Sequence, residues 1–130
     1  MQIIVFTLGE KYYAISTEKV DEISKKIPST NIPNSPEWVE GLINLRGNVV
    51  TLVNLSQLLQ QEDDQCYNNI IIINNTDEKT GILVKDVFEV ANIDNKDIQK
   101  ITDEESEHIM GIIRMEDNLI NIVDFDNLIQ

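Results

Sequence analysis

Residues Gly41 to Leu59 read GLINLRGNVVTLVNLSQLL, with two apolar runs on either side of Arg46-Gly47-Asn48. After the turn, alternate residues would lie on opposite faces of a strand, and both faces are mainly apolar. This pattern is typical of a strand that is buried on most of both faces. Gly47-Asn48 is a two-residue loop that tolerates positive φ. The stretch therefore predicts a β-hairpin with Arg46 beside its tip and one helical turn behind it, and the rest of the chain is organised around this hairpin.

The composition is that of a β-rich globular chain with a strong acidic excess. The 130 residues are 42% hydrophobic but only 5% aromatic, and most of the apolar mass is Ile, Val and Leu, which favour strands. This length suits one domain, or two small subdomains that share a core. The net charge of −13, from 10 basic and 23 acidic side chains, repels phosphate backbones and anionic lipids, so nucleic-acid and membrane partners are disfavoured.

The sequence indicates a cytoplasmic protein. Cys66 is the single cysteine and cannot form an internal disulfide. The chain opens at Met1 without a basic segment followed by a long apolar run, so we expect no secretion signal. Uninterrupted aliphatic or aromatic runs, such as Ile70 to Ile73, are far shorter than the about 20 residues of a spanning helix, so we expect no membrane insertion.

The remaining elements follow from turn and capping residues. Gly-X pairs close two-residue hairpin loops, hydroxyl side chains cap helical turns, and prolines interrupt ladders. Before the opening hairpin these signals predict strands over Ile3 to Leu8 and Lys11 to Ile15, a helical turn from Ser16 or Thr17 through Ile23, a loop over Lys25 to Ser35, and a helical turn from Ser35-Pro36 to Gly41. After it they predict a polar boundary over Gln60 to Asn69, strands over Ile70 to Ile73 and from Gly81 up to Ile93, a loop over Asp94 to His108, and a hairpin with a closing helical turn over Gly111 to Ile129.

An internal repeat is the strongest sign of organisation. At an offset of 70, Gly41 falls on Gly111 and GLINLRGNVVTLVNLSQLL aligns with GIIRMEDNLINIVDFDNLI; at an offset of 67, VDEI at Val20 falls on VFEV at Val87. We therefore expect one domain over 1–130 with approximate repeats over 1–60 and 68–130 that form two subdomains. Two copies of short strands, each unable to bury its own sheet, predict two small barrels packed across a shared apolar seam.

No catalytic or metal-binding constellation is evident. His108 and Cys66 lie in different polar segments, so no activated nucleophile is expected, and neither glycine-rich phosphate-binding motif occurs. Asp124 and Asp126, and the acids between 103 and 107, lack the glycine of a calcium loop. We expect no catalytic residue, no metal and no cofactor.

Arg46 is the one cation in an otherwise apolar hairpin. It is either a structural arginine that pairs with a carboxylate such as Glu22, or an exposed anchor for an acid of a partner. Val20, Ile23 and Leu45 could likewise belong to the core or to an exposed patch. The sequence pattern leaves both alternatives open.

Six short segments of the chain together form a recognisable pattern. They are FTLGE from Phe6, YAI from Tyr13, VDEI from Val20, IPNSP from Ile32, GLINLRG from Gly41 and GILVKDV from Gly81. In this order they resemble the CheW-like coupling proteins of bacterial chemotaxis. The resemblance covers essentially the whole chain, and its most specific part is the Asn44 to Gly47 turn, preceded by a proline pair. The family usually has proline at Thr51, aspartate at Asn54, a basic residue at Ser56 and aspartate at Lys85.

This resemblance implies a mostly β fold of two intertwined SH3-like five-stranded β-barrel subdomains with short helical turns, and no enzymatic activity. It implies an adaptor that joins the cytoplasmic tips of methyl-accepting chemoreceptors to the regulatory domain of a CheA-type histidine kinase, in arrays on the inner face of the membrane. The positions that it links to partner contact are Val20, Glu22, Ile23, Gly41 and Arg46, to which we add Leu45 beside the arginine.

Two other functions are weighed against the adaptor. Small barrels often bind single-stranded nucleic acid, but the acidic charge and the lack of an aromatic and basic face argue against it. An enzyme that uses the Asp124 and Asp126 carboxylates is the other alternative. The repeat itself favours recognition by Arg46: its second copy has Glu116 and Asp117 in place of Arg46 and Gly47, whereas a feature needed only for the fold should occur in both copies.

Overall fold

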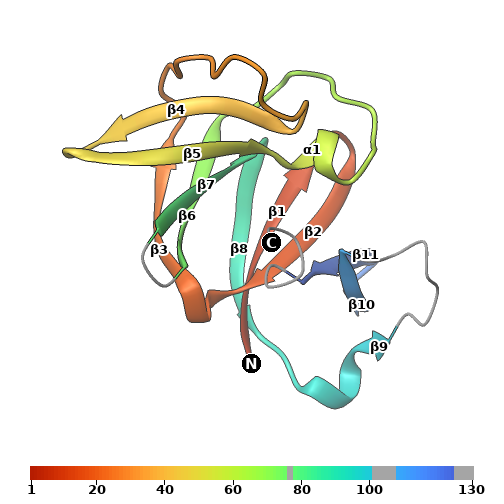
Figure 1. Cartoon of the computed structure of the whole chain (residues 1–130). Coiled ribbons are helices and arrows are strands. Elements are labelled where there is room, and N and C mark those ends of the chain that lie inside the picture. The colour runs from red at the N-terminus through yellow and green to blue at the C-terminus, as the bar shows by residue number, and fades with distance from the viewer. Residues whose placement is uncertain (76–77, 101–107, 125–130) are drawn as a thin grey trace. The chain divides into compact units, whose positions relative to one another are not determined.

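The computed structural model describes residues 1–75, 78–100 and 108–124, which form two compact units built mainly of strands (Figure 1). Unit 1 comprises Met1–Glu18 and Val87–Gln130, and unit 2 comprises Lys19–Asp86. The predicted mostly β class is therefore confirmed. In the described part of the chain, no helix is long and apolar enough to cross a membrane.

Unit 2 is a five-stranded sheet with the strand order β3-β6-β7-β5-β4. Strands β5 and β7 run parallel, whereas the other neighbouring strands of this sheet run antiparallel. The bounds are β3 Val20–Lys25, β4 Val39–Leu45, β5 Asn48–Asn54, α1 Leu55–Leu58, β6 Asn69–Asn75 and β7 Glu78–Val84.

Unit 1 is a six-stranded sheet with the order β8-β1-β2-β11-β10-β9, in which β11 and β2 run parallel. Short 3-10 turns, η1 Thr17–Lys19 and η2 Asn95–Asp97, follow β2 and β8 along the chain. The bounds are β1 Gln2–Leu8, β2 Lys11–Ser16, β8 Asp86–Asn92, β9 Gln99–Lys100, β10 Ile109–Met115 and β11 Asn118–Val123.

The two sheets repeat each other residue by residue. Thr80 pairs with Thr51 across the parallel strands of unit 2, and Tyr13 pairs with Asn121 in unit 1, which are the same positions under the offsets of 67 and 70. The units do not follow the order of the repeat along the chain. Unit 2 combines a hairpin from the second half with three strands from the first, and unit 1 combines a hairpin from the first half with four strands from the second. The polar segment 60–68 lies inside unit 2 and does not separate the two units.

Each unit has an aliphatic core. In unit 2, Ile70 to Ile73 are each at most 1% exposed, which explains the continuous apolar run of β6. In unit 1, the corresponding strands bury a cluster of Ile3, Val5, Ala14, Ile113, Ile120 and Ile122. Burial of each such side chain contributes about 1.5 to 3 kcal/mol, so these strands supply most of the stability.

One glycine in each unit is required by close backbone packing. A Cβ on Gly41, whose φ is 154°, would lie 2.4 Å from the carbonyl oxygen of Thr30. Thr30 and Leu42 exchange two backbone hydrogen bonds of 2.8 Å there. In unit 1, β9 pairs with β10 at Gly111, where a Cβ would lie 2.5 Å from Ile98. The glycine shared by the two repeats is therefore a packing requirement.

Of the two helical turns predicted before the opening hairpin, the first is shorter than predicted and the second is wrong. The turn predicted from Ser16 or Thr17 through Ile23 ends at Lys19, because the following residues form β3 and pair with β6. The helical turn predicted from Ser35-Pro36 to Gly41 is a tight turn in which the Val39 amide donates to the Pro36 carbonyl at 3.0 Å, and β4 begins at Val39. Ladder hydrogen bonds outweigh weak local helix signals in both places.

The predicted barrels are open sheets in the described residues. The strand orders run from β3 to β4 and from β8 to β9, and no pairing between those end strands closes either sheet within 1–75, 78–100 and 108–124. The predicted helical turn after β11, together with Asp126, lies outside the described residues.

Candidate functional site

The hairpin loop of unit 2 contains Arg46 itself. Leu45 pairs with Asn48, so the two loop residues are Arg46 and Gly47, one position earlier than the predicted Gly47-Asn48. Both have positive φ, 50° and 85°, as this type of hairpin turn requires. The side chain of Asn44 accepts a hydrogen bond of 3.0 Å from the Gly47 amide and supports the turn.

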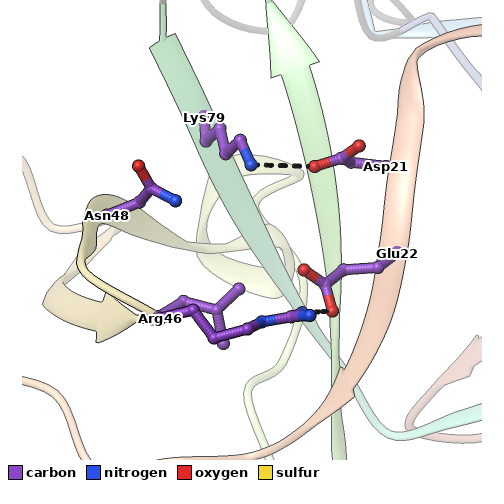
Figure 2. Close-up of a pocket in the computed structure, with 6 residues that line it drawn as sticks. Asp21, Glu22, Arg46, Asn48 and Lys79 are labelled. Atoms are coloured by element: carbon purple, nitrogen blue, oxygen red, sulfur yellow. Dashed lines mark hydrogen bonds and ion pairs between the residues drawn. The ribbon is translucent and has the colours of Figure 1, made fainter.

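Two ion pairs link strand β3 to its surroundings in unit 2, one to the hairpin loop and one to strand β7 (Figure 2). The Arg46 guanidinium donates to the Glu22 carboxylate on β3, and the Lys79 ammonium on β7 lies 3.0 Å from the Asp21 carboxylate. The Arg46 side chain nevertheless remains 69% exposed, whereas that of Glu22 is 29% exposed. The pairing of Arg46 with Glu22 is therefore confirmed, and Arg46 is still accessible, while its contact with an acid of a partner stays a prediction.

The ion pairs border an open depression of about 340 Å³. The formal charges that line the depression balance, since it has two acidic and two basic side chains. Such exposed pairs contribute only about 0 to 1 kcal/mol to stability, so Arg46 and Lys79 are not needed to hold the sheet together. The lining residues are Asp21, Glu22, Leu45, Arg46, Asn48 and Lys79.

Three of the predicted site residues meet in this depression, namely Glu22, Leu45 and Arg46. Ile23 is 40% exposed elsewhere on β3, and Val20 is half-buried opposite Ile73. Gly41 is buried against Thr30, which gives it a structural role. A contact of any of these residues with a partner stays a prediction.

Sequence reasoning missed four residues of this region. Asp21 and Lys79 pair across strands that lie far apart in the sequence, and no local pattern joins them. Asn48 was assigned only to the turn. Val49 is 67% exposed directly after the tip and was expected to be covered. Ile23 and Val49 are thus exposed apolar side chains of the same unit, although neither lines the depression.

A second polar cluster fixes the loop after α1. Asn54 is 3% exposed and caps α1, with its side-chain oxygen accepting from the Gln57 amide at 3.1 Å. Its side-chain nitrogen donates to Asp63 at 2.9 Å, and the Tyr67 hydroxyl donates to the other oxygen of Asp63. The backbone amide of Gln65 donates to the same carboxylate at 2.9 Å.

These contacts change two pKa values. Partial burial raises the pKa of the Asp63 carboxyl, but hydrogen bonds from Tyr67, Gln65, Asn54 and Gln57 outweigh it and hold that pKa below 3.8. Burial, and then the hydrogen bond to Asp63, raise the pKa of the Tyr67 hydroxyl to about 12. The cluster is fully hydrogen-bonded and organises the loop of unit 2.

The residues considered for chemistry do not assemble a site in the described ranges. Cys66 is exposed. Asp124 donates its backbone amide to His108 at 2.8 Å, and Asp126 lies outside the described residues. Within 1–75, 78–100 and 108–124, no group of three His, Cys, Asp or Glu side chains could hold a metal ion.

Comparisons with known proteins agree over nearly the whole chain. The family model of the CheW-like domain matches residues 2–130. The "Chemotaxis protein CheW" of Thermotoga maritima is 29% identical over 132 residues, covering 99% of this chain and 87% of the relative, and that of Bacillus subtilis is 32% identical, covering 95% and 83%. The crystal structure of the scaffolding protein TtCheW from Thermoanaerobacter tengcongensis matches with a TM-score of 0.86 and 30% identity, covering 99% of this chain and 87% of that one.

Proposed function

Because this chain belongs to the CheW-like domain family, we propose that it is a non-catalytic chemotaxis adaptor that couples chemoreceptors to a CheA-type histidine kinase. In the kinase, the part that this chain binds is the regulatory domain. In the methyl-accepting chemoreceptor, it is the cytoplasmic tip. The chain would then be held at receptor arrays on the inner face of the membrane by its partners. The matched relatives and the scaffolding protein of similar structure support this role.

The single observation that carries this proposal is the exposed Arg46 in a neutral, partly apolar depression. Arg46 is preorganised by Glu22 but keeps most of its surface available to a partner carboxylate. Ile23 and Val49 are accessible in the same unit. A few apolar contacts bordered by charge suit a modest and reversible interface.

The two rival functions receive less support. The net charge of −13 opposes binding to a phosphate backbone, and the candidate site pairs its cations with acids. The carboxylate enzyme rests on Asp124 and Asp126, and only Asp124 lies in the described part of the chain.

Affinity capture tests the proposed partners. The full chain, immobilised and exposed to a native lysate, should retain a histidine kinase and a chemoreceptor, identified by mass spectrometry. A Lys26→Glu variant changes an exposed cation away from the depression and should retain both. Retention of neither partner, or retention of single-stranded DNA at physiological salt, would contradict the proposal.

A further inference from the structure

Two consecutive acids of strand β3 line the same depression. Neighbouring residues of a regular strand point to opposite faces of the sheet. Strand β3 is not regular here, because Val20 and Glu22 lie opposite two successive residues of β6, which leaves Asp21 as one extra residue. Such a β-bulge re-aims side chains next to it. Asp21 and Glu22 consequently both border the depression at the hairpin tip of unit 2.

Each of these acids has a cation of its own (Figure 2). One terminal nitrogen of Arg46 donates to one carboxylate oxygen of Glu22. The Asp21 carboxylate lies 3.0 Å from the Lys79 ammonium, and these two side chains are 39% and 32% exposed. Strand β6 lies between β3 and β7 in the sheet, so Lys79 reaches across it to Asp21. The four charges thus form two separate pairs.

Lys79 determines how many carboxylates compete for Arg46. A guanidinium has five N–H donors and can bind two carboxylates at once. Without Lys79, Asp21 would have no cation of its own, and both acids of β3 could take donors of the arginine. The depression would also carry a net negative charge, which repels an acidic side chain of a partner. With Lys79 present, Asp21 is neutralised and Arg46 remains 69% exposed.

Unit 1, whose hairpin tip carries an acid in place of the arginine, has no charges at the equivalent two positions. The offset of 67 places Phe88 at the position of Asp21. It places Tyr12 at the position of Lys79, and the two sheets have matching registers there. These rings make an edge-to-face contact with centroids 5.6 Å apart. The fold therefore joins these positions in both units, and opposite charges join them in the unit that has the arginine.

We propose that Asp21 and Lys79 form a positioning pair, in which Lys79 neutralises Asp21 and so keeps Arg46 available to an acidic side chain of a partner. This inference rests on the proposed function for the identity of the partner, whereas the effect of Lys79 on Arg46 is a property of this chain alone. Because Lys79 acts through Asp21, its removal should matter only while Asp21 is present.

Chemical modification with phenylglyoxal, which reacts with arginine side chains, tests this effect without a partner. The chain has two arginines, and the exposed Arg114 on β10 is the internal reference for Arg46. Peptide mapping by mass spectrometry gives the two rates in the full chain. In Lys79→Gln the rate at Arg46 relative to Arg114 should fall by about threefold or more, because a second carboxylate then holds the guanidinium. The double variant Asp21→Asn with Lys79→Gln should recover the wild-type ratio.

Calorimetric titration tests the consequence for binding, with the regulatory domain of a CheA-type kinase and a receptor cytoplasmic fragment as probes. Lys79→Gln should weaken by about threefold to tenfold the binding that Arg46→Glu abolishes. The double variant Asp21→Asn with Lys79→Gln should bind like the wild type, and so should Lys79→Arg, which keeps the charge. Lys96→Gln is the matched control, because it removes the lysine of another exposed Lys–Asp pair, in unit 1, and should change nothing.

Two results would overturn the proposal. One is an unchanged ratio of Arg46 to Arg114 modification in a folded Lys79→Gln variant. The other is a double variant that binds as weakly as Lys79→Gln, since Lys79 would then contact the partner itself. If Lys79→Gln fails to fold, Asp21→Asn alone decides: Arg46 should react at least as fast as in the wild type, and slower reaction would contradict the proposal. A wild-type chain that binds neither probe contradicts the proposed function and leaves the phenylglyoxal result to decide this inference.

Discussion

The guanidinium of Arg46 donates to the carboxylate of Glu22 while most of the arginine side chain stays exposed. The pair joins the hairpin tip of unit 2 to strand β3, and it holds the arginine while using only some of its N–H donors. A guanidinium carries five donors, so a second carboxylate from a partner can be bound at the same time. This relationship makes Arg46 a preorganised recognition residue in our account.

A double-mutant cycle should separate the structural and recognition roles of this pair. Arg46→Ala, Glu22→Ala and the double variant should each unfold within about 1 kcal/mol of the wild type, with a coupling energy below about 1 kcal/mol, because the pair is exposed. Urea denaturation measures these values. A coupling energy of several kcal/mol would show that Arg46 is chiefly structural.

Replacing glycine by alanine should lower the free energy of unfolding more at Gly41 than at Gly47 of the same hairpin. Gly41→Ala should destabilise the chain by roughly 2 kcal/mol or more, because the new Cβ would meet the carbonyl oxygen of Thr30 at 2.4 Å. Gly47→Ala should cost only about 1 to 2 kcal/mol, since its surroundings are open and only the positive φ opposes alanine. Thermal unfolding of the two variants provides the comparison, and equal losses would contradict the packing argument.

Asn54→Asp should destabilise this chain. The side-chain nitrogen that donates to Asp63 at 2.9 Å would become a carboxylate oxygen, at a cost of roughly 2 kcal/mol at neutral pH. The two like charges would raise the pKa of one carboxyl in the folded variant, so its stability deficit should shrink as the pH falls. The double variant Asn54→Asp with Asp63→Asn should recover stability, and a fully stable single variant would contradict the proposed contact.

The Asp63 and Tyr67 cluster should make stability depend on pH at both extremes. The pKa of Asp63 is lowered in the folded state, so its contribution is present above 3.8 and is lost as the pH falls further. The pKa of Tyr67 is raised to about 12, so its contribution is present below 10.0 and is lost as the pH rises toward 12. Denaturation of Asp63→Asn and Tyr67→Phe across pH should show a reduced acid and alkaline dependence, respectively. Unchanged profiles would contradict these assignments.

The sequence predicts the hairpins well because their signals are local. Alternating apolar residues and the Gly9 and Gly47 turns identify the β1–β2 and β4–β5 hairpins, and the offset of 70 identifies the β10–β11 hairpin. The sequence overestimates the helical turns before the opening hairpin, because residues that cap a helix also suit the bends between strands. Tertiary pairing of β3 with β6 decided the outcome.

The candidate site was predictable only in part. Arg46 stands out as a lone cation, and the sequence suggests Glu22 as a possible partner, which the ion pair confirms. Lys79 and Asp21 could not be paired from the sequence, because their meeting depends on how strands from both halves of the repeat combine. The contrast between Arg46 and Glu116 was visible in the repeat, but the aromatic pair of Tyr12 and Phe88 required the structure.

The most direct test of the coupling role is calorimetric titration of the Arg46→Glu variant with the purified regulatory domain of a CheA-type kinase and with a receptor cytoplasmic fragment. We predict that binding to at least one partner is lost, while the free energy of unfolding stays within about 1 kcal/mol of the wild type. The Lys26→Glu variant should retain wild-type affinity for both. Full affinity of a folded Arg46→Glu variant for both partners, or a large loss of stability with binding per folded molecule intact, would contradict the account.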